Sequence, residues 1–203
     1  MKPISRRTTA LITLACLAVG TGGCGWLGGG NTSLRLESRS QPAVLEPNFT
    51  TAVYRFEDPN TLDVYLSDLP MARLLEAADG RLTEPLPPGT LARVHVFLNP
   101  RAGYTPIDYT ASNATVTYVV MAGEVYGVYT GAGFFLPGTT PGEGEFSGKT
   151  SGANLKLAAA TEGFSDRLGP SELSGRISAV RDDEKAQRLG ALVSSLSRFA
   201  SQN

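Results

Sequence analysis

The stretch TVTYVVMAGEVYGVYT, residues 115–130, carries the strongest β signal of the chain. Two runs rich in valine, threonine and tyrosine, residues 115–121 and 124–130, flank the pair Ala122-Gly123. β-Branched and aromatic residues favour strands, and a glycine-containing pair between two such runs favours a tight turn. The sequence therefore predicts an antiparallel hairpin at this point, with further strands on both sides of it.

Shorter runs with alternating apolar and polar residues, separated by Gly, Pro, Asn and Asp, occur before and after this hairpin. We expect strands at residues 33–38, 51–57, 62–66, 92–98, 145–149, 154–160 and 173–180. Asp58-Pro59-Asn60 suits a turn between the second and third of these, and Ser151-Gly152 suits a turn between the fifth and sixth. Both pairs are therefore predicted to be hairpins.

Two segments favour helices. Residues 67–79 contain Pro70 near their start and are followed by Gly80, which can end a helix. Residues 182–200 place apolar side chains on one stripe and begin with acidic residues, which stabilise a helix N-terminus. Eight or nine short strands without alternating helices predict a mainly β fold, an antiparallel β-sandwich or barrel with one short internal helix and a C-terminal amphipathic helix.

The N-terminus has the three parts of a secretory signal. MKPISRR is basic, residues 10–19 (ALITLACLAV) are apolar but too few to span a bilayer as a helix, and small residues 20–23 precede Cys24. The segment Thr21-Gly22-Gly23-Cys24 resembles the lipobox of bacterial lipoproteins, usually Leu-(Ala/Ser)-(Gly/Ala)-Cys. Gly23 and Cys24 fit that pattern, whereas Thr21 stands where an aliphatic residue is usual.

The resemblance implies export, cleavage before Cys24 and attachment of acyl chains, including palmitate, to that cysteine. Three regions follow: a signal peptide at residues 1–23, a lipid-anchored glycine-rich tether at residues 24–32, and a single β-rich domain at residues 33–203. The expected location is the periplasmic or outer face of a bacterial membrane.

Composition excludes several classes of protein. Residues 1–23 hold three of the 18 basic residues and none of the 19 acidic ones, so the remaining 15 basic residues leave a net charge of −4. A mildly acidic domain is unsuited to binding nucleic acid. Both cysteines, Cys16 and Cys24, lie in the N-terminal segment, so the domain has no disulfide and no cysteine nucleophile.

No motif in the domain indicates catalysis, a metal or a cofactor. His95 is the only histidine, on the same side of its predicted strand as Arg93 and Phe97, which suggests a solvated strand residue. Acidic residues 57, 58, 63 and 68 could approach one another, but their spacing matches no calcium loop. Four aromatic residues could form an exposed aromatic surface or line a barrel interior; they are Tyr118, Tyr126, Phe134 and Phe135.

These observations predict a membrane-anchored envelope lipoprotein that acts as a non-catalytic binding or structural module, with an envelope protein or a small apolar molecule as partner. One alternative is a lipocalin-like barrel that binds a small apolar ligand, although the Gly-x-Trp of lipocalins is missing and the only tryptophan, Trp26, lies in the tether. The other is a hydrolase that uses carboxylates, which would require two of them to converge in a concave pocket.

Overall fold

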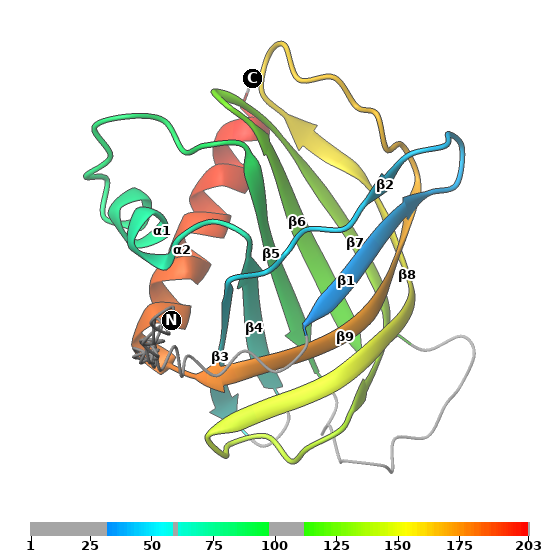
Figure 1. The fold of residues 1–203 in the computed structure, drawn as a ribbon, viewed down its shortest axis with the longest axis vertical. Helices are drawn as coiled ribbons and strands as arrows, with labels where there is room; N and C mark the ends of the chain where they lie inside the picture. The colour runs from blue at the N-terminus through cyan, green and yellow to red at the C-terminus, as the bar shows by residue number, and fades with distance from the viewer. Residues whose placement is uncertain (1–31, 59–60, 98–111, 203) are drawn as a thin grey trace, which may run out of the picture.

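The computed structural model describes residues 32–58, 61–97 and 112–202 (Figure 1). The signal peptide, Cys24 and all but the last residue of the tether lie outside the described residues. The described chain forms nine strands and two helices. These are β1 (Ser33–Ser38), β2 (Val44–Leu45), β3 (Thr51–Asp58), β4 (Thr61–Ser67), α1 (Met71–Ala78), β5 (Gly89–Val96), β6 (Ala114–Ala122), β7 (Val125–Pro137), β8 (Glu145–Ala160), β9 (Ser171–Arg181) and α2 (Asp183–Ala200).

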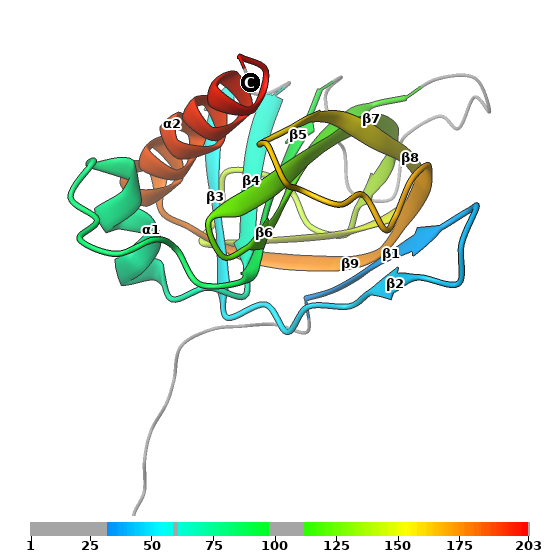
Figure 2. The same ribbon diagram turned by 90° about the horizontal axis from the view of Figure 1, so that it is seen from above.

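The strands form one sheet that closes into a barrel. Their order is β2-β1-β9-β3-β4-β5-β6-β7-β8, and β9 also pairs with β8. Strands β3 to β9 therefore make a closed ring, while β1 and β2 extend from the edge of β9 that also meets β3 (Figures 1 and 2). The pairs described are antiparallel apart from β3–β9. The predicted fold class, mainly antiparallel β with a short internal helix and a C-terminal helix, is confirmed.

The hairpin at residues 115–130 forms as the sequence predicts. β6 and β7 pair from Ala122 and Val125 at the turn to Ala114 and Gly133 at the far end. β7 then continues to Pro137, so the apolar residues after the predicted hairpin belong to the same strand. The predicted helices also form: α1 begins after Pro70, and Asp182 caps α2 by accepting the backbone N–H of Lys185 at 3.0 Å.

The prediction of a hairpin within residues 145–160 is wrong. These residues form the single strand β8, which pairs with β7 on one edge and β9 on the other. The register of its pairing with β9 shifts between Thr150 and Ala153, and Gly152 has a φ of 66°. A β-bulge with glycine in the left-handed region uses the residue types of a turn but lets the strand continue.

Aromatic side chains fill the inside of the barrel. The ring of Phe146 lies 5.6 Å from the rings of both Tyr54 and Phe135. These three side chains are fully buried, as are Tyr118 and Tyr129. Leucine, valine and isoleucine residues from β4, β5, β6, β8 and β9, with two leucines from β1, complete this inner core. Because large rings occupy the interior, room for a ligand has to be sought at an end of the barrel or on its outer face.

A second core lies between the outer face of the sheet and the helices, which pack on the same side of the barrel (Figure 2). Leu189 and Val193 of α2 belong to the same buried cluster as Tyr65, Leu91 and Val119 of the sheet. An ion pair of 2.6 Å between Arg188 and Asp79 joins α2 to the end of α1. Strands β3 to β7 are therefore covered on both faces over part of their length.

We expect Gly131→Ala to destabilise the fold, because a Cβ at this position would lie 1.8 Å from the carbonyl oxygen of Asn154 on the paired strand β8. Overpacking against backbone typically costs about 1–3 kcal/mol. Gly144→Ala is the matched control, since a Cβ there meets no atom within 4 Å. The free energy of unfolding in urea measures both variants. Equal stability of the two variants would contradict the close packing of β7 against β8.

Candidate functional site

The four aromatic residues singled out in the sequence do not form one exposed surface. Tyr118 and Phe135 are fully buried inside the barrel, and Phe134 is half-buried. Tyr126 belongs to the outer core, where its hydroxyl donates to the carbonyl of Leu196 on α2 at 3.2 Å. The alternation of the two paired strands puts Tyr118 and Tyr126 on opposite faces of the sheet. Tyr118 and Phe135 therefore line the interior.

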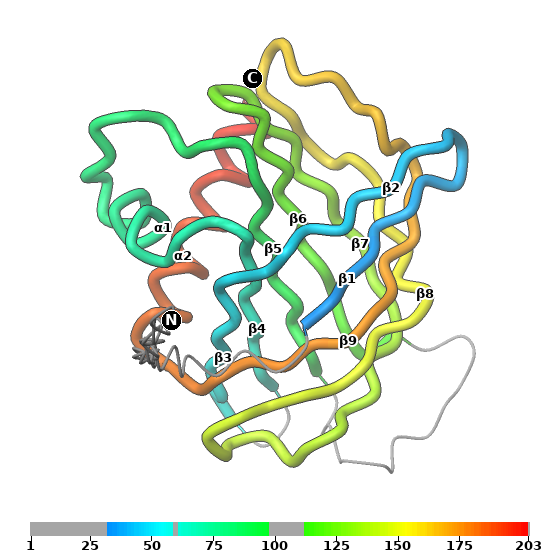
Figure 3. Tube along the Cα trace, in the orientation of Figure 1, coloured from blue at the N-terminus to red at the C-terminus, as the bar shows by residue number. Residues whose placement is uncertain are grey.

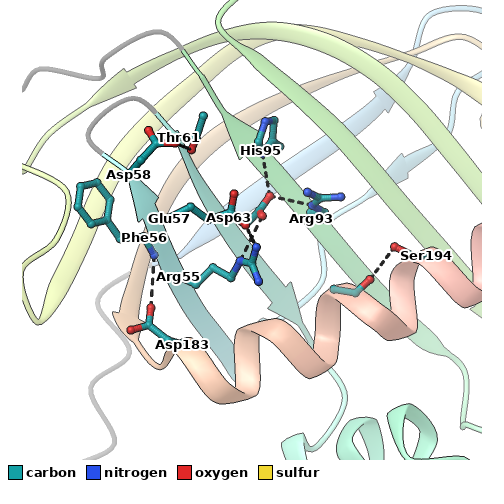
Figure 4. Close-up of polar contacts among 11 residues, drawn as sticks. Arg55, Phe56, Glu57, Asp58, Thr61, Asp63, Arg93, His95, Asp183 and Ser194 are labelled. Carbon is teal, nitrogen blue, oxygen red and sulfur yellow. Dashed lines mark hydrogen bonds and ion pairs between the residues drawn. The ribbon is translucent and has the colours of Figure 1, made fainter.

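A charged cluster surrounds Asp63 on the outer face of the sheet (Figure 4). The Asp63 side chain is only 2% exposed, and one carboxylate oxygen lies 2.8 Å from Nε of Arg93 and 2.9 Å from Nδ1 of His95. Nε of Arg55 lies 3.6 Å from the other oxygen. His95 thus shares a strand face with Arg93, as the alternation predicts, and its ring stacks on Phe97. We call Arg55, Asp63, Arg93 and His95 the Asp63 cluster.

Strand register explains the Asp63 cluster. Asp63 of β4 is directly opposite Arg55 of β3 and His95 of β5, while Arg93 lies two residue pairs further along, on the same face. Burial by itself would lower the pKa of Arg93, but the hydrogen bond to Asp63 and the negative charge of Asp63 together outweigh it and raise the pKa. Burial, aided by the negative charge of Asp63, raises the pKa of the neighbouring Tyr65 to about 12. A buried carboxylate is thus balanced by the charge of Arg93.

This arrangement joins strands, and the hydrogen bonds described for Asp63 and His95 connect them to each other and to Arg93 and not to a hydroxyl group. A hollow beside the Asp63 cluster is lined in part by Ser194 of α2. The hydroxyl of Ser194 donates to the carbonyl of Gly190 at 2.8 Å (Figure 4). Of the residues lining that hollow, Asp63 is the only carboxylate. The described residues therefore show no second carboxylate beside Asp63 in a concave site, which the hydrolase alternative requires.

The other acidic residues that could have approached one another to bind calcium each interact with a different partner. Glu57 pairs with Arg55, and Asp58 accepts from the hydroxyl of Thr61 at 2.8 Å. Asp68 accepts the backbone N–H of Thr90 at 2.6 Å. Within the residues that the structure describes, no group of three or more His, Cys, Asp or Glu side chains could hold a metal ion.

The chain between β8 and β9, the β6–β7 hairpin and β2 lie toward the same end of the barrel (Figures 1 and 3). Side chains from these segments line an apolar cleft. Its volume is about 620 Å³. Most of its walls are apolar, and the lining residues are Pro42, Ala43, Val44, Leu45, Val120, Ala122, Val125, Tyr129, Gly163, Phe164, Ser165, Arg167 and Leu168. Sequence reasoning did not find this cleft, because its walls come from segments far apart in the chain.

Two contacts fix the wall formed by the β8–β9 connection. The Phe164 ring lies against β7 at Gly127, where a Cβ would come within 2.3 Å of it. Asp166 accepts the hydroxyl of Tyr129 at 2.5 Å and the backbone N–H of Leu168 at 3.0 Å. Burial raises the pKa of Tyr129, and its bond to Asp166 raises it further. Burial opposes the charge on Asp166, yet these hydrogen bonds lower its pKa, so the wall is held by an ionised carboxylate.

We expect Asp63→Asn to lower the free energy of unfolding by about 3 kcal/mol, because removing one partner of a buried ion pair leaves the other charges uncompensated. Glu37→Gln is the control: its ion pair with Arg35 is exposed, and such pairs contribute about 0–1 kcal/mol. Urea unfolding of both variants measures the difference. A loss for Asp63→Asn no larger than that for Glu37→Gln would show that the Asp63 cluster contributes nothing to stability.

Neither described helix, α1 or α2, is both long and apolar enough to cross a membrane. Comparison of the chain with models of known protein families, with curated proteins and with solved structures found no match. The candidate sites are therefore the apolar cleft and the Asp63 cluster, and their own geometry is the basis for assigning a function.

Proposed function

We propose that the protein is an exported bacterial lipoprotein, anchored to a membrane through Cys24, whose barrel domain is a non-catalytic module that binds a small apolar ligand in the cleft. The observation that carries the ligand is the cleft itself. Its volume of about 620 Å³ falls in the range of about 300–1,000 Å³ that is usual for small-molecule sites. Such sites are mostly apolar, with a few polar groups that orient the ligand.

The filled interior of the barrel supports a ligand site at the end of the barrel and not inside it. Tyr54, Tyr118, Tyr129, Phe135 and Phe146 are each at most 1% exposed and fill the space that a lipocalin-like ligand would occupy. Tyr129 belongs both to the inner core and to the cleft lining. The base of the cleft is therefore continuous with a rigid core, which favours a preformed binding site over one assembled by the ligand.

The anchor rests on the N-terminal sequence. A basic start, a short apolar run and small residues lead to Cys24, after which the glycine-rich tether joins the domain. One acyl chain binds a membrane only marginally, so durable attachment needs the several chains of a bacterial lipoprotein. The Asp63 cluster gives less support to an enzyme, since its histidine and carboxylate bond to each other and to arginine.

We expect Cys24→Ser to abolish lipid attachment when the chain is produced in a bacterial host fed radiolabelled palmitate. The thiol is the acceptor, and serine cannot replace it in thioether formation. Cys16→Ser is the matched control, because Cys16 lies inside the apolar run of the signal and should leave labelling intact. Equal labelling of the two variants, or a mature N-terminus downstream of Cys24 by mass spectrometry, would contradict the anchor.

We expect Ala122→Trp to reduce binding of dodecanol, a neutral apolar probe, about tenfold or more, because the indole would occupy the cleft that Ala122 borders. Ala122 is exposed, so the larger side chain meets the cleft and not the core. Ala72→Trp makes the same change at an exposed position of α1, away from the cleft lining. Native mass spectrometry of the detergent-solubilised protein counts bound dodecanol. An equal loss in both variants would rule out the cleft as its site.

A further inference from the structure

The polar side chains of the cleft are gathered on one wall. Besides Tyr129, whose hydroxyl is already bonded to Asp166, the only polar side chains in the lining are Ser165 and Arg167. Both belong to the connection between β8 and β9, whereas the walls from β2, β6 and the start of β7 are apolar. A ligand in the cleft therefore meets an apolar surface along most of its length and a cation with a hydroxyl at one side.

Arg167 has no ion pair with any described residue, whereas most arginines of the described chain do. Arg35, Arg39 and Arg188, for example, are paired with carboxylates on neighbouring segments. The carboxylate next to Arg167, that of Asp166, is instead turned to the phenol of Tyr129 and to the backbone N–H groups of Leu168 and Gly169. Arg167 thus brings a positive charge to the cleft, and the carboxylate of the adjacent Asp166 forms its hydrogen bonds with other groups.

The backbone around Arg167 is held in place. Asp166 before it is fixed to Tyr129 of β7, and its carboxylate also accepts the N–H of Leu168 after it. Leu168 is 8% exposed and packs into the inner core. A guanidinium on a fixed backbone loses less conformational freedom when it binds an anion, which makes the pairing more favourable.

We propose that the ligand of the cleft is a free long-chain carboxylic acid, with its alkyl chain along the apolar walls and its carboxylate at Arg167 and Ser165. This inference rests on the proposed function, and it specifies that the ligand carries a negative charge. A carboxylate at an apolar site is costly without a partner, and a guanidinium satisfies it with strong charge-assisted hydrogen bonds. The hydroxyl of Ser165, on the same wall, adds a neutral donor.

The test compares laurate with dodecanol, which have the same chain length and differ in the charge of the head. Binding is measured by native mass spectrometry on the full lipoprotein in a fixed concentration of nonionic detergent, so that competition by detergent is equal in all samples. We expect the wild-type protein to bind laurate about tenfold more tightly than dodecanol at pH 7.5. Arg167→Gln should remove this preference by weakening laurate binding about tenfold, with dodecanol unchanged.

Two variants make the test specific. Arg167→Lys keeps the charge and should keep most of the preference for laurate. Arg176→Gln removes an exposed arginine of β9 that does not border the cleft, and should behave as wild type. Equal binding of laurate and dodecanol by the wild type, or equal effects of Arg167→Gln and Arg176→Gln, would overturn the inference and leave the apolar ligand in place. Failure of the wild type to bind either ligand would overturn the proposed function and the inference with it.

Discussion

The fold depends on the pairing of β9 with strands on both of its edges. One edge meets β8 from Ser171 to Val180, and the other meets β1 along its first half and β3 at its end. This closes the ring of strands, with β3 joined to β9 through two residue pairs, so that each strand of the ring has a neighbour on both edges over at least part of its length. The chain passes directly from β9 into α2 through the N-cap residue Asp182. The backbone N–H of Asp182 donates to the carbonyl of Tyr54, so the helix begins beside β3. Closure and the placement of the helix are therefore consequences of one strand.

Closure gives the sheet two faces that are both partly buried. The inner face is filled by aromatic rings, and the outer face carries a second buried core where the helices cover it. Beside the helix, the same strands change to charged residues at Arg55, Asp63 and Arg93. The Asp63 cluster lies at the boundary of the helix-covered region. There the charged side chain of Asp63 is buried by its neighbours. Its ion pairs hold together three strands that carry the helix.

Local patterns in the sequence predict the strands and helices well because β-branched runs, turn residues and helix caps act over a few residues. They fail where a local signal has two structural uses. Ser151-Gly152 suits both a turn and a bulge, and pairing with two neighbouring strands decides for the bulge. Likewise, alternation assigns Tyr118 and Tyr126 to opposite faces of the sheet but does not predict that both are buried. Tyr118 is buried in the inner core and Tyr126 in the core beneath the helices. Neither candidate site could be derived from the sequence alone: Asp63 needs the strand register, and the cleft needs segments more than 30 residues apart to meet.

Strand β2 forms a wall of the cleft that is only weakly paired with the rest of the sheet. It has only two residues, Val44 and Leu45, and pairs with β1 alone, at the outer end of the sheet order. Both residues line the cleft, yet neither belongs to the closed ring. Two residue pairs with β1 and the packing of Leu45 against the inner core hold this wall, whereas the ring is held by the pairing of seven strands with one another. Because a weakly paired segment opens at a lower free-energy cost than a closed ring of strands, widening the cleft at this wall does not require the barrel to unfold.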